Sequence, residues 1–173
     1  MKIKILFFTG LSVLILVLGL YLILKQNMFA GKKPFMPKDS TSATINNVSV
    51  FNEESEILLQ QLIADSACII FRFTPNTCDC LEPQFADGVK VAENAFSKNR
   101  FFVVIPANNP KDILFFRSRT KLSCLVLGTE ETLIEEYDGS QTPYACIIYP
   151  NMTVRNIVSV QPETIKQLID YAK

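Results

Sequence analysis

The sequence predicts an α/β domain over residues 48–173, with a central mixed sheet flanked by helices and one transmembrane helix before it. Three observations lead to this fold class. Residues 5–24 form an uncharged apolar run, shorter apolar runs of strand length recur later, and segments with helical spacing of apolar side chains separate them. The predicted domain of about 125 residues has the usual size of a unit with its own core.

The apolar run at residues 5–24 is the candidate membrane span. At 1.5 Å per residue its length matches a hydrocarbon core roughly 30 Å thick. Lys2 and Lys4 precede it, so a cleaved signal peptide is the alternative, but the run is long for one and no clear cleavage site follows. We therefore expect an uncleaved anchor over residues 1–25. Lysines also follow the span, yet a short N-terminal tail most simply stays inside. This topology predicts a single-pass protein of the cytoplasmic membrane, with its C-terminal domain on the periplasmic (outer) side.

A tether and the first half of the domain follow. Residues 26–47 are rich in Lys, Pro, Ser, Thr and Asn and lack a sustained apolar period, which predicts a flexible linker. A short helix is expected at residues 55–64 and a strand buried on both faces at residues 67–73. Glu82 and Pro83 suit the first turn of a second helix, whose core-facing side chains are Phe85, Val89, Ala92 and Phe96.

The second half is expected to complete a mixed sheet. Strands are predicted at residues 101–105 and 122–127, with a helix between them that starts at Asn109-Pro110. A short helix at 130–137 precedes a hairpin of residues 144–149 and 154–160, and Pro162 opens the last helix. A parallel βαβ half is thus joined to a hairpin and a final helix.

The candidate site is Cys78-Asp79-Cys80, in a polar turn between a buried strand and a helix, and Thr142-Pro143 leads a later buried strand. This arrangement resembles the thioredoxin superfamily, where a cysteine pair begins a helix and a cis-proline before another strand faces it. The resemblance implies Cys78 and Cys80 as catalytic residues and Thr142 and Pro143 as substrate-binding residues. The additional helix and strand before Thr142 look most like membrane-anchored thiol-disulfide proteins of bacterial envelopes, including those of cytochrome c maturation; peroxiredoxins share that segment.

The site departs from the superfamily pattern in three ways. One spacer residue is missing between the cysteines, no Trp precedes them, and Arg72 stands where the family carries an acidic or amide residue. An arginine beneath the site would favour a thiolate at Cys78 or Cys80, as would the helix N-terminus. The alternative is that Arg72 pairs with Asp87, Glu82 or another acid for structural reasons.

The resemblance implies thiol-disulfide exchange with protein thiols or disulfides of the envelope. A Cys-x-Cys disulfide closes a small ring with unfavourable torsions, which predicts an easily reduced couple. Two other functions stay open. Thr77-x-x-Cys80 resembles the peroxiredoxin signature, with Thr77 orienting a peroxide toward Cys80 and Cys78 or Cys124 as the second thiol, although Pro75 lies closer to Thr77 than that family prefers. A thioredoxin-fold binding module without catalysis is the third possibility.

Composition excludes several other classes of function. The chain has no His, which excludes Ser-His-Asp chemistry and weakens a metal site, so neither a metal nor a cofactor is expected. The chain has 17 basic residues (Lys and Arg) and 17 acidic residues (Asp and Glu). This balance argues against the basic surface of a nucleic-acid-binding protein. Cys68, Cys124 and Cys146 lie in apolar strands and are expected to be core residues. The pattern assigns no oligomeric state.

Overall fold

The computed structural model describes residues 43–63, 65–96 and 100–172. The predicted anchor at residues 1–25 and most of the predicted tether lie outside these ranges. Within them, no helix combines the length and the apolar character that crossing a membrane requires. The predicted tether extends to residue 47, but Ala43 and Thr44 already pair with a strand of the domain and Ile45 is buried. The folded domain therefore includes the last residues assigned to the tether.

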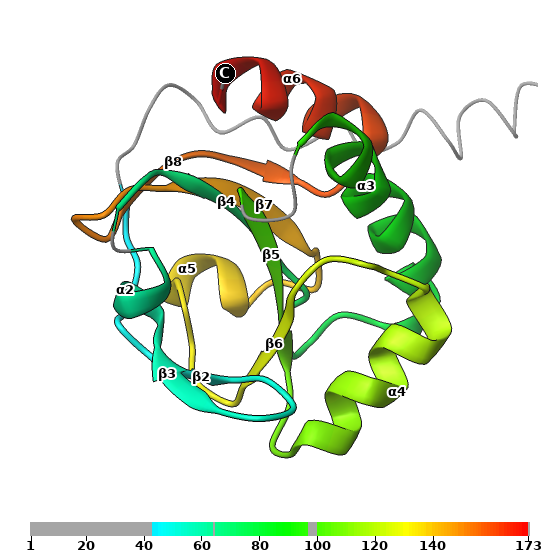
Figure 1. Ribbon diagram of the computed structural model, residues 1–173. Helices are drawn as coiled ribbons and strands as arrows, with labels where there is room; N and C mark the ends of the chain where they lie inside the picture. The colour runs from blue at the N-terminus through cyan, green and yellow to red at the C-terminus, as the bar shows by residue number, and fades with distance from the viewer. Residues whose placement is uncertain (1–42, 64, 97–99, 173) are drawn as a thin grey trace, which may run out of the picture. The chain divides into compact units, whose positions relative to one another are not determined.

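The described domain contains one mixed sheet with helices on both faces (Figure 1). Its strand order is β1-β8-β7-β4-β5-β6-β2-β3, in which β4, β5 and β6 run parallel and the other pairings are antiparallel. The strands are β1 (Ala43–Thr44), β2 (Ser49–Phe51), β3 (Glu56–Leu58), β4 (Cys68–Arg72), β5 (Phe101–Pro106), β6 (Val126–Thr129), β7 (Tyr144–Ile148) and β8 (Thr153–Ser159). The helices are α2 (Leu59–Leu62), α3 (Glu82–Ala95), α4 (Pro110–Thr120), α5 (Glu135–Asp138) and α6 (Pro162–Ala172), with a 3-10 turn at Asp79–Leu81.

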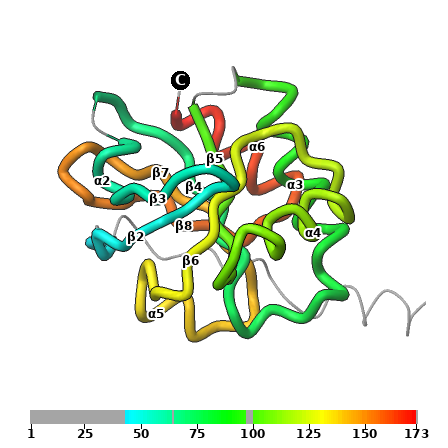
Figure 2. Tube along the Cα trace, turned by 60° about the horizontal axis from the view of Figure 1, so that its bottom comes forward, coloured from blue at the N-terminus to red at the C-terminus, as the bar shows by residue number. Residues whose placement is uncertain are grey.

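The two faces of β4 pack into separate cores, because successive side chains of a strand point in opposite directions. Ile69, Phe71 and Phe73 belong to the core beneath α3, α4 and α6. Cys68 and Ile70 belong to the core on the side of α2 and α5. Figures 1 and 2 show these two groups of helices on opposite sides of the sheet. The structure thus confirms that β4 is buried on both faces.

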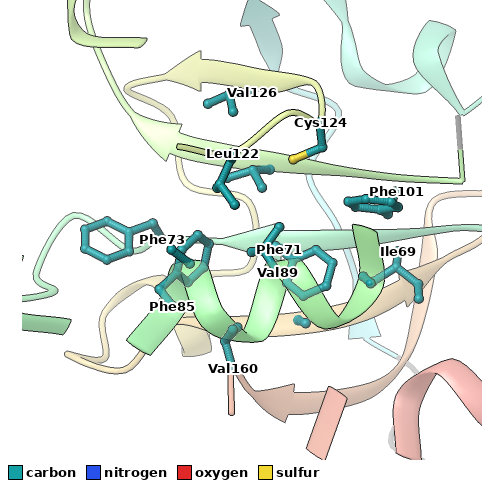
Figure 3. Close-up of a cluster of buried hydrophobic side chains, with 14 of the residues drawn as sticks. Ile69, Phe71, Phe73, Phe85, Val89, Phe101, Leu122, Cys124, Val126 and Val160 are labelled. Carbon is teal, nitrogen blue, oxygen red and sulfur yellow. The ribbon is translucent and has the colours of Figure 1, made fainter. Parts of the chain in front are cut away.

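Helix α3 carries the predicted apolar face, with Phe85, Val89 and Ala92 fully buried. Gly88 allows the helix to lie close to the end of β8, since a Cβ atom at residue 88 would be only 2.6 Å from Cγ1 of Val160. Figure 3 shows Val160 beside this helix. The position of α3 relative to the sheet is therefore fixed near its middle, a few residues after the cysteine turn.

Several predicted boundaries are wrong. The expected helix at residues 55–64 begins as strand β3, which pairs with β2, and only Leu59–Leu62 is helical. The strand expected at 122–127 starts at Val126, and the helix expected at 130–137 is reduced to Glu135–Asp138. At residues 56–58 the pairing with β2 overrides a local pattern that fits both states.

Candidate functional site

A tight loop leads from β4 to the cysteine pair. Phe73 anchors its start, with ring centroids 5.2 Å from Phe85 and 5.6 Å from Phe116, and Figure 3 shows the Phe73 and Phe85 rings together. The Thr77 N–H donates to the Thr74 carbonyl at 3.0 Å, and the hydroxyls of these two residues are 2.7 Å apart. Phe73 and this turn hold the loop against the domain, and residues 78–80, which follow, are exposed.

Both cysteines of the pair are exposed and are free thiols. Cys78 has an extended backbone conformation and caps the 3-10 turn, because its Sγ accepts a hydrogen bond from the Cys80 N–H at 3.2 Å. Helix α3 follows directly, with Pro83 in its first turn. The pKa of Cys80 is raised, first by the hydrogen bond between its thiol and Cys78 and then by partial desolvation. Within the pair, Cys80 therefore tends to keep its proton while its thiol donates to the Cys78 sulfur.

The loop before β7 lies beside the loop that carries the cysteines. Arg72 is paired with Tyr144 across β4 and β7, and the Thr74 hydroxyl donates to the Ser140 carbonyl at 2.9 Å. Thr142 is exposed, whereas Pro143 is buried and its carbonyl accepts from the Val160 N–H at 3.1 Å. The described residues contain no cis peptide bond, so the bond before Pro143 is trans and the expected cis-proline is absent. The structure thus puts this loop beside the cysteine-bearing loop, but without the backbone geometry that the resemblance implies.

Arg72 is fully buried and pairs with Asp138, an acid on α5. Its Nε and Nη2 donate to the Asp138 carboxylate at 3.0–3.3 Å, and Nη2 also donates to the Glu131 carbonyl. The Tyr144 hydroxyl and the Leu133 N–H donate to the same carboxylate. Burial and the Asp138 charge raise the pKa of Tyr144. Of the two interpretations open from the sequence, the structure shows the structural pairing with another acid.

Arg119 of α4 contacts the cysteine turn, and no motif in the sequence points to this residue. Its Nη2 donates to the Glu82 carboxylate, and its Nη1 lies 3.9 Å from Asp79, the residue between the cysteines. Glu82 is almost completely buried in the first turn of α3, and this burial raises its pKa while the charge of Arg119 opposes the rise. The two contacts attach α4 to the turn that carries both thiols.

The other three cysteines are buried in the two cores. Burial raises the pKa of Cys68 and of Cys124 to about 12 and raises that of Cys146 as well. They behave as small apolar side chains, as predicted. Among the described residues, no group of three or more His, Cys, Asp or Glu side chains is arranged to hold a metal ion.

No protein-family model matches the chain, and no curated protein sequence is significantly similar to it. Solved structures do match. Reduced Prx3 from Vibrio vulnificus is 15% identical, with a TM-score of 0.54 over 75% of this chain and 97% of its own. A candidate thiol:disulfide interchange protein, DsbE, from Chlorobium tepidum is 14% identical, with a TM-score of 0.56 over 76% and 96%. Peroxiredoxin 5 from Alvinella pompejana is 10% identical, with a TM-score of 0.54 over 75% and 97%. At these identities the similarity concerns the fold alone, and the described domain has the thioredoxin-like fold that the sequence predicts.

Proposed function

We propose that this chain is a membrane-anchored thiol-disulfide exchange protein, in which Cys78 attacks and Cys80 completes the exchange. The proposal rests on the two exposed free thiols just before α3. The Cys80 N–H donates a hydrogen bond of 3.2 Å to the Cys78 sulfur. This bond holds the Cys78 sulfur beside the backbone of Cys80, so the second thiol is close to the first.

The reaction has two balanced steps. The Cys78 thiolate attacks one sulfur of a partner disulfide, so a Cys78–partner disulfide forms and the second partner sulfur leaves as a thiolate. Cys80 then loses its proton and attacks the Cys78 sulfur, which forms the Cys78–Cys80 disulfide and releases the first partner sulfur as a thiolate. The partner gains two electrons and this protein loses two. The reverse sequence oxidises a partner dithiol.

The one-residue spacer bears on the direction of electron flow. Closing a disulfide between Cys78 and Cys80 requires a small ring, and strained disulfides have more oxidising potentials. An oxidant or isomerase-like role fits such a couple better than a reductant role does.

The peroxidase alternative has less support from the site. It needs a thiolate at Cys80, whereas the environment of Cys80 raises its pKa. It also assigns peroxide binding to the Thr77 hydroxyl, which is nearly buried and 2.7 Å from the Thr74 hydroxyl. Disulfide exchange through Cys78 requires neither feature.

The predicted anchor at residues 5–24 completes the proposal. It would hold the domain at the outer side of the cytoplasmic membrane, where protein disulfides form and persist. Protein thiols and disulfides of the envelope are then the proposed partners.

The test uses the full chain purified in mild detergent and a disulfide-bearing protein substrate. We expect Cys78→Ser to abolish turnover and Cys80→Ser to accumulate the mixed disulfide with Cys78. Cys124→Ala, which removes a buried thiol, is the control and should retain activity. Equal turnover by the wild type and Cys78→Ser would refute the mechanism. If Cys78 and Cys80 never form a disulfide across a glutathione redox titration, the domain is a binding module instead.

A further inference from the structure

One face of α4 is exposed next to the cysteine turn. Its side chains follow the helical spacing i, i+3, i+4, i+7 and i+8 and comprise Lys111, Leu114, Phe115, Ser118 and Arg119, here called the α4 face. Leu114 is 50% exposed and Phe115 is 61% exposed, whereas Ile113 and Phe116 on the other side of the helix are buried in the core. Helix α4 thus presents two large apolar side chains to solvent, in addition to the two that it buries in the core.

Arg119 connects this face to the thiol site. Its guanidinium lies over the Phe115 ring, 4.3 Å from the ring centroid, and also contacts Glu82 and Asp79. One side chain therefore separates the exposed aromatic ring from the residue between Cys78 and Cys80. A segment bound on the α4 face would lie beside the thiols.

The charges of the face restrict its partner. Lys111 lies at one end of the α4 face and Arg119 at the other, and none of its five residues is acidic. A guanidinium has five N–H donors, more than the two carboxylate contacts described here occupy. The Asp79 contact is long and the Asp79 side chain is 79% exposed, so an incoming carboxylate can compete with it.

We propose that the α4 face binds the polypeptide segment that flanks the reactive disulfide of the partner protein, and that this segment carries an apolar side chain next to carboxylates. The apolar side chain would pack on Leu114 and Phe115, and the carboxylates would pair with Lys111 and Arg119. This inference rests on the proposed exchange reaction and adds its substrate class. A small uncharged disulfide such as 2-hydroxyethyl disulfide lacks both the apolar side chain and the carboxylates and would react without using the face.

The test measures exchange by the full chain in detergent with short peptides whose single Cys is linked to thionitrobenzoate. The Cys78 thiolate attacks the peptide sulfur, thionitrobenzoate leaves and is detected, and Cys80 then attacks the Cys78 sulfur and releases the peptide thiol. The chain is reduced beforehand and is consumed in this single turnover, so kcat/KM is measured as the second-order rate constant of thionitrobenzoate release. One peptide carries Leu and Glu near its Cys, a second replaces Glu by Lys, and a third has only Ser and Gly. We expect kcat/KM for the first peptide to exceed that for the other two by about tenfold, the scale of one well-packed contact.

Substitutions then locate the effect. Phe115→Ala should lower kcat/KM for the Leu-Glu peptide by about tenfold, and Lys111→Gln should reduce the preference for Glu over Lys. Both should leave exchange with uncharged 2-hydroxyethyl disulfide unchanged, because that disulfide has no group for the α4 face to bind. Tyr171→Ala is the matched control, because Tyr171 is 75% exposed and shares a pocket with Cys68 at the opposite end of β4.

Two outcomes would overturn the inference. The first is equal kcat/KM for all three peptides, or an unchanged value in Phe115→Ala, while 2-hydroxyethyl disulfide is still exchanged. The second is self-association that Phe115→Ala abolishes, because the α4 face would then bind a second copy of the chain. Failure of the wild type to exchange both 2-hydroxyethyl disulfide and the disulfide-bearing protein substrate would instead refute the proposed function. Binding of a peptide with Ser in place of its Cys would still test the α4 face.

Discussion

The buried pair of Arg72 and Asp138 offers a prediction that the structure makes quantitative. Every group that contacts the Asp138 carboxylate is a donor: Arg72 Nε and Nη2, the Tyr144 hydroxyl and the Leu133 N–H. Asp138→Asn replaces one carboxylate oxygen by an NH₂ group, which must face donors in either orientation. The substitution also leaves the Arg72 charge buried without its counter-charge.

Breaking one partner of a buried ion pair costs about 3–5 kcal/mol, because the other charge stays out of water. A domain of this size has a free energy of unfolding of about 5–15 kcal/mol, so Asp138→Asn should remove a large fraction of it. Replacing both partners by apolar residues, in Arg72→Met with Asp138→Leu, should recover only part of the loss. No buried charge then remains, but the Tyr144 hydroxyl and the Leu133 N–H lose their acceptor.

The measurement is guanidinium unfolding followed by circular dichroism, since the chain contains no Trp for fluorescence. Glu136→Gln is the control, because this acid lies on the same short helix α5 but is exposed. We expect a lower midpoint for Asp138→Asn without a change in the denaturant slope, and almost no change for the control. A loss below about 0.5 kcal/mol would refute the reasoning, since it would match an ordinary surface substitution.

Two further predictions concern thiols and pH. In the native chain a thiol reagent should label only Cys78 and Cys80 rapidly, because burial and a raised pKa protect the other three thiols. In denaturant the reagent should label all five cysteines. A third thiol that is labelled rapidly in the native chain would contradict the burial. The raised pKa of Glu82 means that the folded state binds its proton more tightly than the unfolded state does. The wild type should therefore lose stability relative to Glu82→Gln as the pH rises above 4.5, the ordinary pKa of this carboxyl group. A constant difference would show that burial does not raise the pKa of Glu82.

The sequence predicted the elements whose patterns fit only one state. Strand β4 and helix α3 agree closely with the prediction, because the apolar run at β4 has the length of a strand and ends in a turn, and the apolar side chains of α3 recur with a 3.6-residue period. Residues 55–64 were assigned to a helix from their apolar residues, yet residues 56–58 pair with β2 instead. That pairing depends on where β6 places β2, which no local pattern contains.

The same division holds in the site. The exposed cysteine turn follows from its polar composition and its place between β4 and α3. The trans peptide bond before Pro143 could not be predicted in this way. The expectation of a cis bond came from the resemblance to the thioredoxin superfamily and not from the residues themselves. Asp138 was not identified as the partner of Arg72, because its position depends on how α5 folds back against β4 and β7.

The positions of the two arginines also change the electrostatic account of the thiols. The sequence predicts Arg72 as a possible charge beneath the site, but its guanidinium is neutralised by Asp138. Arg119 reaches the turn from outside, where it is partly exposed and shared between Glu82 and Asp79. A partner carboxylate that competes with Asp79 for Arg119 would alter the charge beside Cys78 and Cys80 on binding. Substrate binding on the α4 face and reactivity at the thiols would then be coupled through Arg119, and Asp79→Asn should weaken that coupling by removing the competing carboxylate.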